Sequence, residues 1–169
     1  MTEIQFNEIK ERLSKCCEDR HLTCENQREE FLGNVFDRVS RYFKSKDDLE
    51  RVEALCDIAV FYLKSFDIKY DSQKFLMTDD TNIHSVINRS YNMISVTSTR
   101  TYSVNSNGYS FIAMLENFFN NLGFDFYKCM LEAIKRLRVE QVRLRYGIMQ
   151  IMKVVNYSKI ERRVLWGIN

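Results

Sequence analysis

Apolar residues recur every three or four positions along most of this chain, which is the pattern of amphipathic helices. The spacing predicts helices over about 2–19, 24–44, 48–65, 80–94, 111–122 and 125–135. No proline occurs anywhere, so each of these segments can be helical without interruption. We therefore predict an all-α fold, an antiparallel bundle of about five to six helices.

Several helix ends carry the residues that such ends favour. Thr2 and Thr23 can cap the first two helices, and Asp47 suits the start of the third. Gly123 suits the end of the fifth. Because only the short connection 45–47 separates the second helix from the third, we predict that these two helices pair antiparallel. The apolar side of the second helix, which should face the bundle, consists of Phe31, Val35, Phe36, Val39, Tyr42 and Phe43.

Two stretches break the helical pattern. Residues 66–71 are typical of a turn, and they lead to a short piece around 72–76. From 95 to 110 the chain changes to Ser, Thr, Asn and β-branched residues and ends in S-N-G. We predict a polar loop or insertion over 95–110, with a short hairpin as the alternative.

Charge is distributed unevenly and divides the chain in two. Residues 135–169 hold nine Lys or Arg against two Glu, a net +7, which leaves 16 basic and 21 acidic residues, a net −5, in 1–134. We predict a helical bundle domain over 1–135 and a basic C-terminal helix or tail over 136–169. Such a tail could touch phosphates of nucleic acid or a membrane surface. Since basic runs are usually solvated and no aromatic residues are interleaved for base stacking, nucleic acid is not an expected partner.

Composition favours a soluble protein in a reducing compartment. The apolar content of 45% and the charged content of 28% are typical of globular domains. The five cysteines and the two histidines form no C-x-x-C or zinc-ligand spacing, so we expect reduced thiols. The chain has no apolar run of about 18 residues, and its polar start lacks a signal-peptide core. We predict a cytoplasmic protein without a membrane partner.

Two acids interrupt the most apolar patterned segment, Glu50–Lys64. Glu53 and Asp57 lie four positions apart, so they project from one face of a helix, one turn apart. Their neighbours Leu55 and Cys56 are apolar, and we therefore expect the two carboxylates to be buried. Buried carboxylates need a counter-charge, which is either a cationic side chain or a metal.

The antiparallel second helix brings further acids towards this pair, namely Glu29, Glu30 and Asp37. A magnesium ion prefers several oxygen ligands from carboxylates and waters, often completed by substrate phosphates. Two facing helices that each supply inward acids can build such a site. Because the chain has no glycine-rich phosphate loop, nucleotide phosphates would be held by the metal and by Lys or Arg.

The segment V-E-A-L-C-D-I-A-V-F follows an acid-bearing helix and precedes a D-I-K-Y-D turn. It resembles the MazG-like all-α nucleoside triphosphate pyrophosphatases, above all the phage and bacterial members with an A-L-C-D-I-x-V-F helix. Residues 111–135 are similar to the last core helices of those proteins, so the likeness covers about 27–76 and 111–135. The resemblance implies a homo-oligomer, dimer or tetramer, that cleaves an NTP or dNTP into a nucleoside monophosphate and pyrophosphate. The cofactor that it implies is Mg²⁺, which neutralises phosphate charge and activates a water.

The motif of that family places a pair of acids on each of two antiparallel helices. Carried onto this chain, the resemblance implies magnesium ligands, a catalytic acid and residues that contact substrate phosphates. The implied magnesium ligands are Asp37, Glu53 and Asp57. The implied catalytic acid is Glu30, and the implied phosphate contacts are Arg41 and Lys135.

The chain departs from the motif on both helices. Arg38 and Arg41 stand where carboxylates are expected, and the spacing of Glu53 and Asp57 is four rather than three. An arginine at this place could itself neutralise Glu53 or Asp57, which would give an ion-paired helix interface without a metal. The sequence therefore supports two hypotheses: a magnesium-dependent nucleotide pyrophosphohydrolase, and a catalytically inactive helical module for binding or assembly.

The segment after Lys135 also departs from the family, whose members continue with a Ser-Arg-Thr-Gly-like stretch and a polar tail. A shifted reading of one permissible back-translation of 136–153 gives such a stretch. Our hypothesis is that the reading frame changes near Lys135. Codons in the gene that cannot yield the shifted peptide would refute it.

Overall fold

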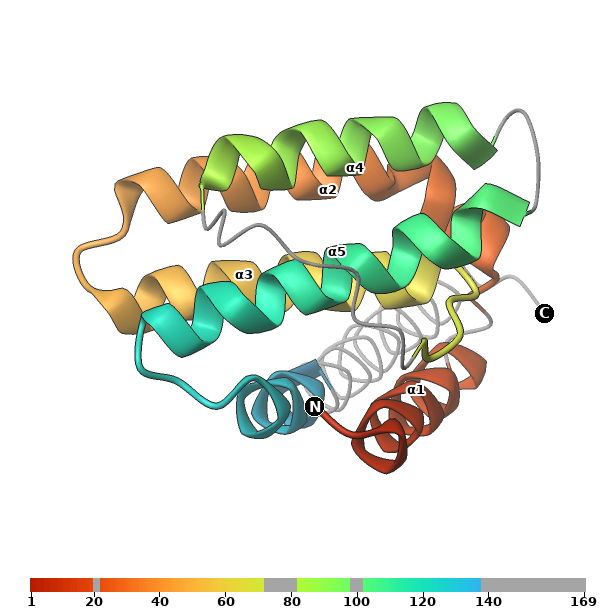
Figure 1. The fold of residues 1–169 in the computed structure, drawn as a ribbon, viewed down its shortest axis with the longest axis horizontal. Helices are drawn as coiled ribbons and strands as arrows, with labels where there is room; N and C mark the ends of the chain where they lie inside the picture. Colours follow the sequence, from red (N-terminus) through yellow and green to blue (C-terminus); the bar gives the residue numbers. More distant parts are fainter. Residues whose placement is uncertain (20–21, 72–81, 98–101, 138–169) are drawn as a thin grey trace, which may run out of the picture. The chain divides into compact units, whose positions relative to one another are not determined.

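A computed structural model describes residues 1–19, 22–71, 82–97 and 102–137, and every regular element in these ranges is a helix (Figure 1). The elements are α1 (Glu3–Glu18), α2 (Cys24–Lys44), α3 (Asp48–Ser65), α4 (Ile83–Thr97) and α5 (Tyr102–Asn121), with a further helix over 126–137. The prediction of an all-α helical bundle is confirmed. The chain divides into two compact units, Met1–Ile134 and Lys135–Asn169, and the packing described below concerns the first.

The predicted caps hold the helix ends. Thr2 forms a capping box with Gln5, and the Thr23 hydroxyl accepts a hydrogen bond from the backbone N–H of Asn26 at 3.2 Å. The Asp47 carboxylate accepts one from the backbone N–H of Glu50 at 2.8 Å. At the end of α5, Gly123 adopts a positive φ of 81°, a left-handed conformation that glycine enters without steric cost.

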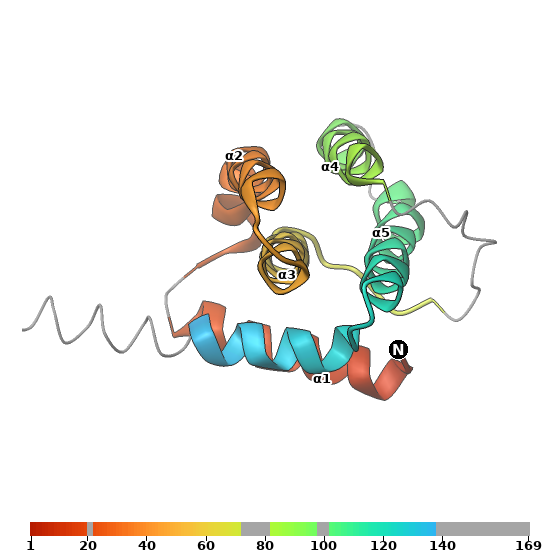
Figure 2. The same ribbon diagram turned by 90° about the vertical axis from the view of Figure 1, so that its left-hand side faces the viewer.

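Helix α3 is the central element of the first unit. It packs along α2, to which a short turn joins it antiparallel, and it also contacts α1 and α5. Figure 2 views α2, α3 and α4 nearly along their axes, with α4 lying beside α2 and α5. Because α3 has neighbours on most sides, apolar residues are buried almost all around it, from Val52 to Leu63.

Aromatic side chains from three helices fill the core next to α3. Phe31 of α2 meets Phe66 edge to face, with ring centroids 5.0 Å apart, and the ring of Tyr62 lies 4.2 Å from that of Phe111 on α5. All four side chains are fully or almost fully buried. Aromatic pairs in this distance range add stability beyond the area they bury, so this cluster fixes α2 and α5 against α3.

The hydroxyl of Tyr62 is a weak point of this cluster. It is buried and has no hydrogen-bond partner among the described residues, and burial raises the pKa of Tyr62 well above its usual value. Removing an unsatisfied buried polar group relieves its desolvation cost, so Tyr62→Phe should raise the free energy of unfolding by about 1 kcal/mol, measured by urea denaturation. The matched control is Tyr109→Phe, since the buried Tyr109 hydroxyl is hydrogen-bonded to Tyr70. Tyr109→Phe should lower the free energy of unfolding. If both variants change this free energy in the same direction, the expectation is contradicted.

Two predictions about apolar and polar segments are wrong. Residues 95–97 belong to α4 and 102–110 to α5, where a polar loop over 95–110 was expected. Low helix propensity is a weak signal that packing overrides, and α5 buries Tyr109 and Phe111 against the core.

The second wrong prediction concerns Phe36 and Phe43, which were expected on the buried side of α2. Their side chains are 51% and 59% exposed. The predicted short piece at 72–76 lies outside the described residues.

The segment after α3 is fastened to α1. The Lys10 ammonium donates hydrogen bonds to the Asp67 carboxylate at 2.8 Å and to the backbone carbonyl of Ile68 at 2.6 Å. The bond from Lys10 lowers the pKa of the Asp67 carboxyl below its usual value. These polar contacts hold the segment that carries the buried side chain of Ile68 against α1.

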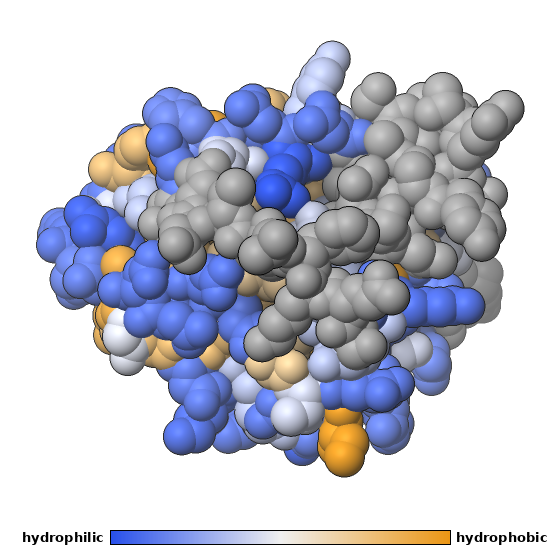
Figure 3. Space-filling view, in the orientation of Figure 1, coloured by the Kyte–Doolittle hydropathy of each residue, from blue (hydrophilic) through white to orange (hydrophobic). Residues whose placement is uncertain are grey.

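The face seen in Figure 3 is mostly hydrophilic, with separate hydrophobic patches. In the described part of the chain, no helix is long and apolar enough to cross a membrane. Among the residues whose burial the structure describes, the large apolar side chains that remain exposed are Ile4, Phe36, Phe43, Leu49 and Tyr91.

Candidate functional site

The acids singled out in the sequence form a strip along α3. Between Val52 and Val60, Glu53 and Asp57 are the two residues that are not buried. Their side chains are 31% and 24% exposed, so they are half-buried rather than buried as expected. Within Val52–Val60 the other side chains of α3 are buried, so this strip is the part of that segment that solvent can reach.

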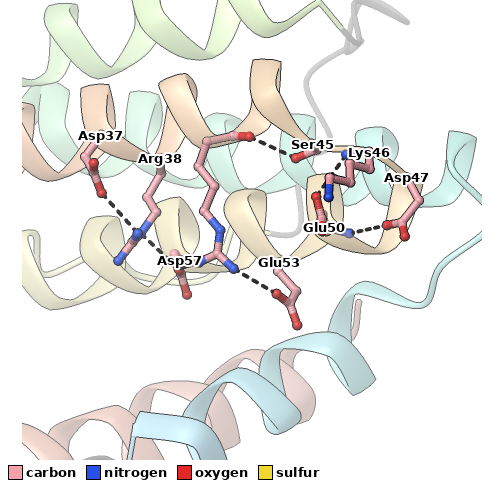
Figure 4. Close-up of polar contacts among 9 residues, drawn as sticks. Asp37, Arg38, Ser45, Lys46, Asp47, Glu50, Glu53 and Asp57 are labelled. Carbon is pink, nitrogen blue, oxygen red and sulfur yellow. Dashed lines mark hydrogen bonds and ion pairs between the residues drawn. The ribbon is translucent and has the colours of Figure 1, made fainter.

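Two arginines of α2 face this strip, namely Arg38, which Figure 4 labels, and Arg41. Arg41 Nη2 donates a hydrogen bond to Glu53 Oε2 at 3.1 Å, and its Nη1 lies 3.9 Å from Asp57 Oδ2. Arg38 Nε lies 2.9 Å from the same Asp57 oxygen. Both carboxylates of α3 thus receive a guanidinium from the antiparallel helix, as the hypothesis of an ion-paired interface predicted.

Arg38 also joins Asp37 to the group. Its Nη1 donates a hydrogen bond to Asp37 Oδ2 at 3.0 Å, while the guanidinium carbon lies 5.8 Å from the ring centroid of Phe61. The Nε atom of Arg38 is buried and lies within ion-pair distance of Asp57. Its N–H does not form a hydrogen bond to the Asp57 oxygen. The side chain of Asp37 is 71% exposed, so it lies at the outer edge of the group. We call Asp37, Arg38, Arg41, Glu53 and Asp57 the ion-pair cluster.

The turn between α2 and α3 places the two helices in register for this cluster. The Ser45 hydroxyl donates a hydrogen bond to the Arg41 carbonyl at 2.9 Å, and the Lys46 backbone N–H donates one to Glu50 Oε2 at 2.9 Å. Together with the Asp47 cap these bonds satisfy backbone groups at the end of α2 and the start of α3. Arg41 and Glu53, twelve positions apart in the chain, are therefore brought within hydrogen-bond distance.

The resemblance also implied roles for Glu30, Lys135 and Arg41. Glu30 is exposed on α2, about two turns before Asp37. Lys135 is the first residue of the second compact unit. Arg41 donates a hydrogen bond to Glu53, and its contact with substrate phosphates stays a prediction. The predicted partnership of acids and arginines is thus present, while the predicted gathering around a nucleotide stays a prediction.

The described residues contain no group of three or more His, Cys, Asp and Glu side chains arranged to hold a metal ion. Glu53 and Asp57 present two carboxylates on one helix face, but guanidinium groups lie between them and Asp37. This donor set does not fit a magnesium site built from acids on two facing helices.

Comparisons of the chain with protein-family models, with curated proteins and with solved structures found no match. The ion-pair cluster is therefore interpreted from its own chemistry. Sequence reasoning identified its five members, but it missed two features that depend on packing: the contact of Arg38 with Phe61 and the partial exposure of the acids.

Proposed function

We propose that this chain is a catalytically inactive helical module for binding or assembly. In it, ion pairs between α2 and α3 occupy the place where a MazG-like pyrophosphatase would hold magnesium. One observation carries the proposal: Asp57 lies within ion-pair distance of both Arg38 and Arg41, and Glu53 is hydrogen-bonded to Arg41.

Charge explains why this arrangement disfavours a divalent cation. The ion-pair cluster contains three carboxylates and two guanidiniums, a net charge of −1, whereas four acids without arginines would give −4. A magnesium ion would have to displace two guanidiniums and would then lie beside their positive charge. Ion pairs that are already formed between the helices therefore compete with the metal for the same oxygens.

The second candidate is a magnesium-dependent nucleoside triphosphate pyrophosphohydrolase. The partial exposure of Glu53 and Asp57 favours it, because ligands from solvent can reach both carboxylates. In this case Asp37, Glu53 and Asp57 would be the metal ligands, and Arg41 would turn towards the phosphates.

One assay separates the two functions. The protein is incubated with magnesium and each common ribonucleoside and deoxyribonucleoside triphosphate, and pyrophosphate release and the melting temperature are measured. We expect no pyrophosphate above the buffer blank and no shift of Tm when magnesium is added. Pyrophosphate release that Asp57→Asn abolishes would establish the enzyme instead. Release that survives Asp57→Asn would place a catalytic site outside the ion-pair cluster, and either result would refute the inactive module.

A further inference from the structure

Helix α2 presents an exposed face that the bundle does not use. Positions 29, 33, 36, 40 and 43 alternate in steps of four and three, which places them along one line of the helix, and all five are exposed. Phe36 and Phe43 supply two large aromatic side chains on this line, 51% and 59% exposed. We call these five positions the outer seam of α2. Aromatic side chains exposed at heptad spacing are typical of a helix that packs against another helix.

The outer seam borders α4 near Phe43. The ring centroid of His84 lies 6.4 Å from that of Phe43, and α4 packs beside α2. Tyr91, two turns further along α4 than His84, is also exposed. The seam is therefore part of a broader surface rather than a pair of isolated side chains.

Gly33 marks a notch in the outer seam. It lies inside a helix of 21 residues, where glycine is less stable than alanine. A Cβ atom at this position would meet no heavy atom within 4 Å, and the φ of Gly33 is not positive. Among the described residues nothing requires a glycine here, whereas close approach of a helix from another molecule would require one.

The charges along α2 indicate which helix that is. Glu25, Glu29 and Glu30 are exposed in its first half, and Arg41 and Lys44 in its second half. A second α2 that runs antiparallel would set the acidic half of each helix against the basic half of the other. This complementarity is intrinsic to the sequence of α2 and holds for both copies at once, as a two-fold interface requires.

We propose that the outer seam of α2 is the surface on which a second copy of this chain docks, through an antiparallel pair of α2 helices. Phe36 of each copy fills the notch above the partner's Gly33. The same register places Lys44 opposite the partner's Glu25 and Ser40 opposite the partner's Glu29. This inference rests on the proposed function, for which it names the partner.

The first test is sedimentation equilibrium of the full chain over a range of concentrations. We expect a monomer–dimer equilibrium that Phe36→Asp shifts towards monomer by roughly a hundredfold in Kd, because a charge replaces the central aromatic group. Leu49→Asp is the matched control, since Leu49 is as exposed as Phe36 but lies off the seam, at the start of α3. It should leave the equilibrium unchanged, and circular dichroism melts verify that each variant is folded. A wild-type monomer, or a dimer indifferent to Phe36→Asp, would overturn the proposal.

Gly33→Leu separates docking from folding. Leucine favours the helix more than glycine does and has open space at Cβ, so the melting temperature of the monomer should rise. The same side chain fills the notch, so the Kd of the dimer should rise by about tenfold or more. A defect in folding cannot give these opposite effects. A dimer that tolerates Gly33→Leu would refute the notch as the contact.

Charge reversal tests the register. Lys44→Glu and Glu25→Lys should each weaken the dimer, because each brings like charges together across the interface, and the double variant should recover the wild-type Kd. Failure of the double variant to recover would refute this register. A monomeric chain that releases no pyrophosphate would refute the self-association while the inactive module stands. A dimer that does release pyrophosphate would refute the inactive module and leave the interface.

Discussion

Replacing both Arg38 and Arg41 with methionine is expected to lower the free energy of unfolding by about 2 kcal/mol. Methionine retains much of the apolar stem of arginine but provides no positive charge, so the contact of the Arg38 guanidinium with the Phe61 ring is lost as well. Glu53 and Asp57 would then lie half-buried on α3 without the guanidiniums that face them. The expected loss lies between the loss for an exposed ion pair and the loss for a fully buried one, because the two acids are half-buried. Urea denaturation at neutral pH measures it.

Two further variants show whether charge is the cause. Adding Glu53→Gln and Asp57→Asn to the double-methionine variant should recover most of the lost stability, because neutral amides need no counter-charge. Arg51→Met is the matched single control. Arg51 forms an exposed ion pair with Asp48 at 2.8 Å within α3, and its loss should cost less than about 1 kcal/mol. A double-methionine variant no less stable than Arg51→Met would show that the arginines of α2 do not stabilise the acids.

The features that were predicted correctly depend on local chemistry. Thr2, Thr23 and Asp47 accept backbone hydrogen bonds at the starts of α1, α2 and α3, which their short side chains can do wherever a helix begins. The pairing of Arg41 with Glu53 could also be predicted. The short connection between α2 and α3 forces them antiparallel, and helical spacing then determines which side chains meet.

The features that were missed depend on which neighbours cover a helix. Phe36 belongs to the apolar stripe of α2 by its spacing, yet Phe31 and Val35 are buried while Phe36 is exposed. Glu53 and Asp57 have buried neighbours along the chain, but their own strip is only partly covered by α2. A single sequence gives the spacing of a face but not the width of the surface that packs on it. The start of α5 was missed for another reason, since its Ser and Asn residues have a low helix propensity that packing overrides.

Leu55→Ala is expected to lower the free energy of unfolding by about 3 kcal/mol or more, one of the largest effects of a single substitution in this chain. Leu55 is fully buried on α3, the helix that contacts α1, α2 and α5, so its truncation would leave a cavity in the core of the first unit. The packed helices around it can close such a space only in part.

Leu49→Ala gives the comparison within the same helix and the same residue type. Leu49 is exposed in the first turn of α3, and its truncation should cost less than about 1 kcal/mol, since it removes little buried surface. Both values come from urea denaturation at one protein concentration. The difference between them measures how strongly the bundle encloses α3, the helix that carries Glu53 and Asp57. Equal losses for the two leucines would mean that α3 is not the central helix, and the ion-pair cluster would then lack the rigid support that its geometry requires.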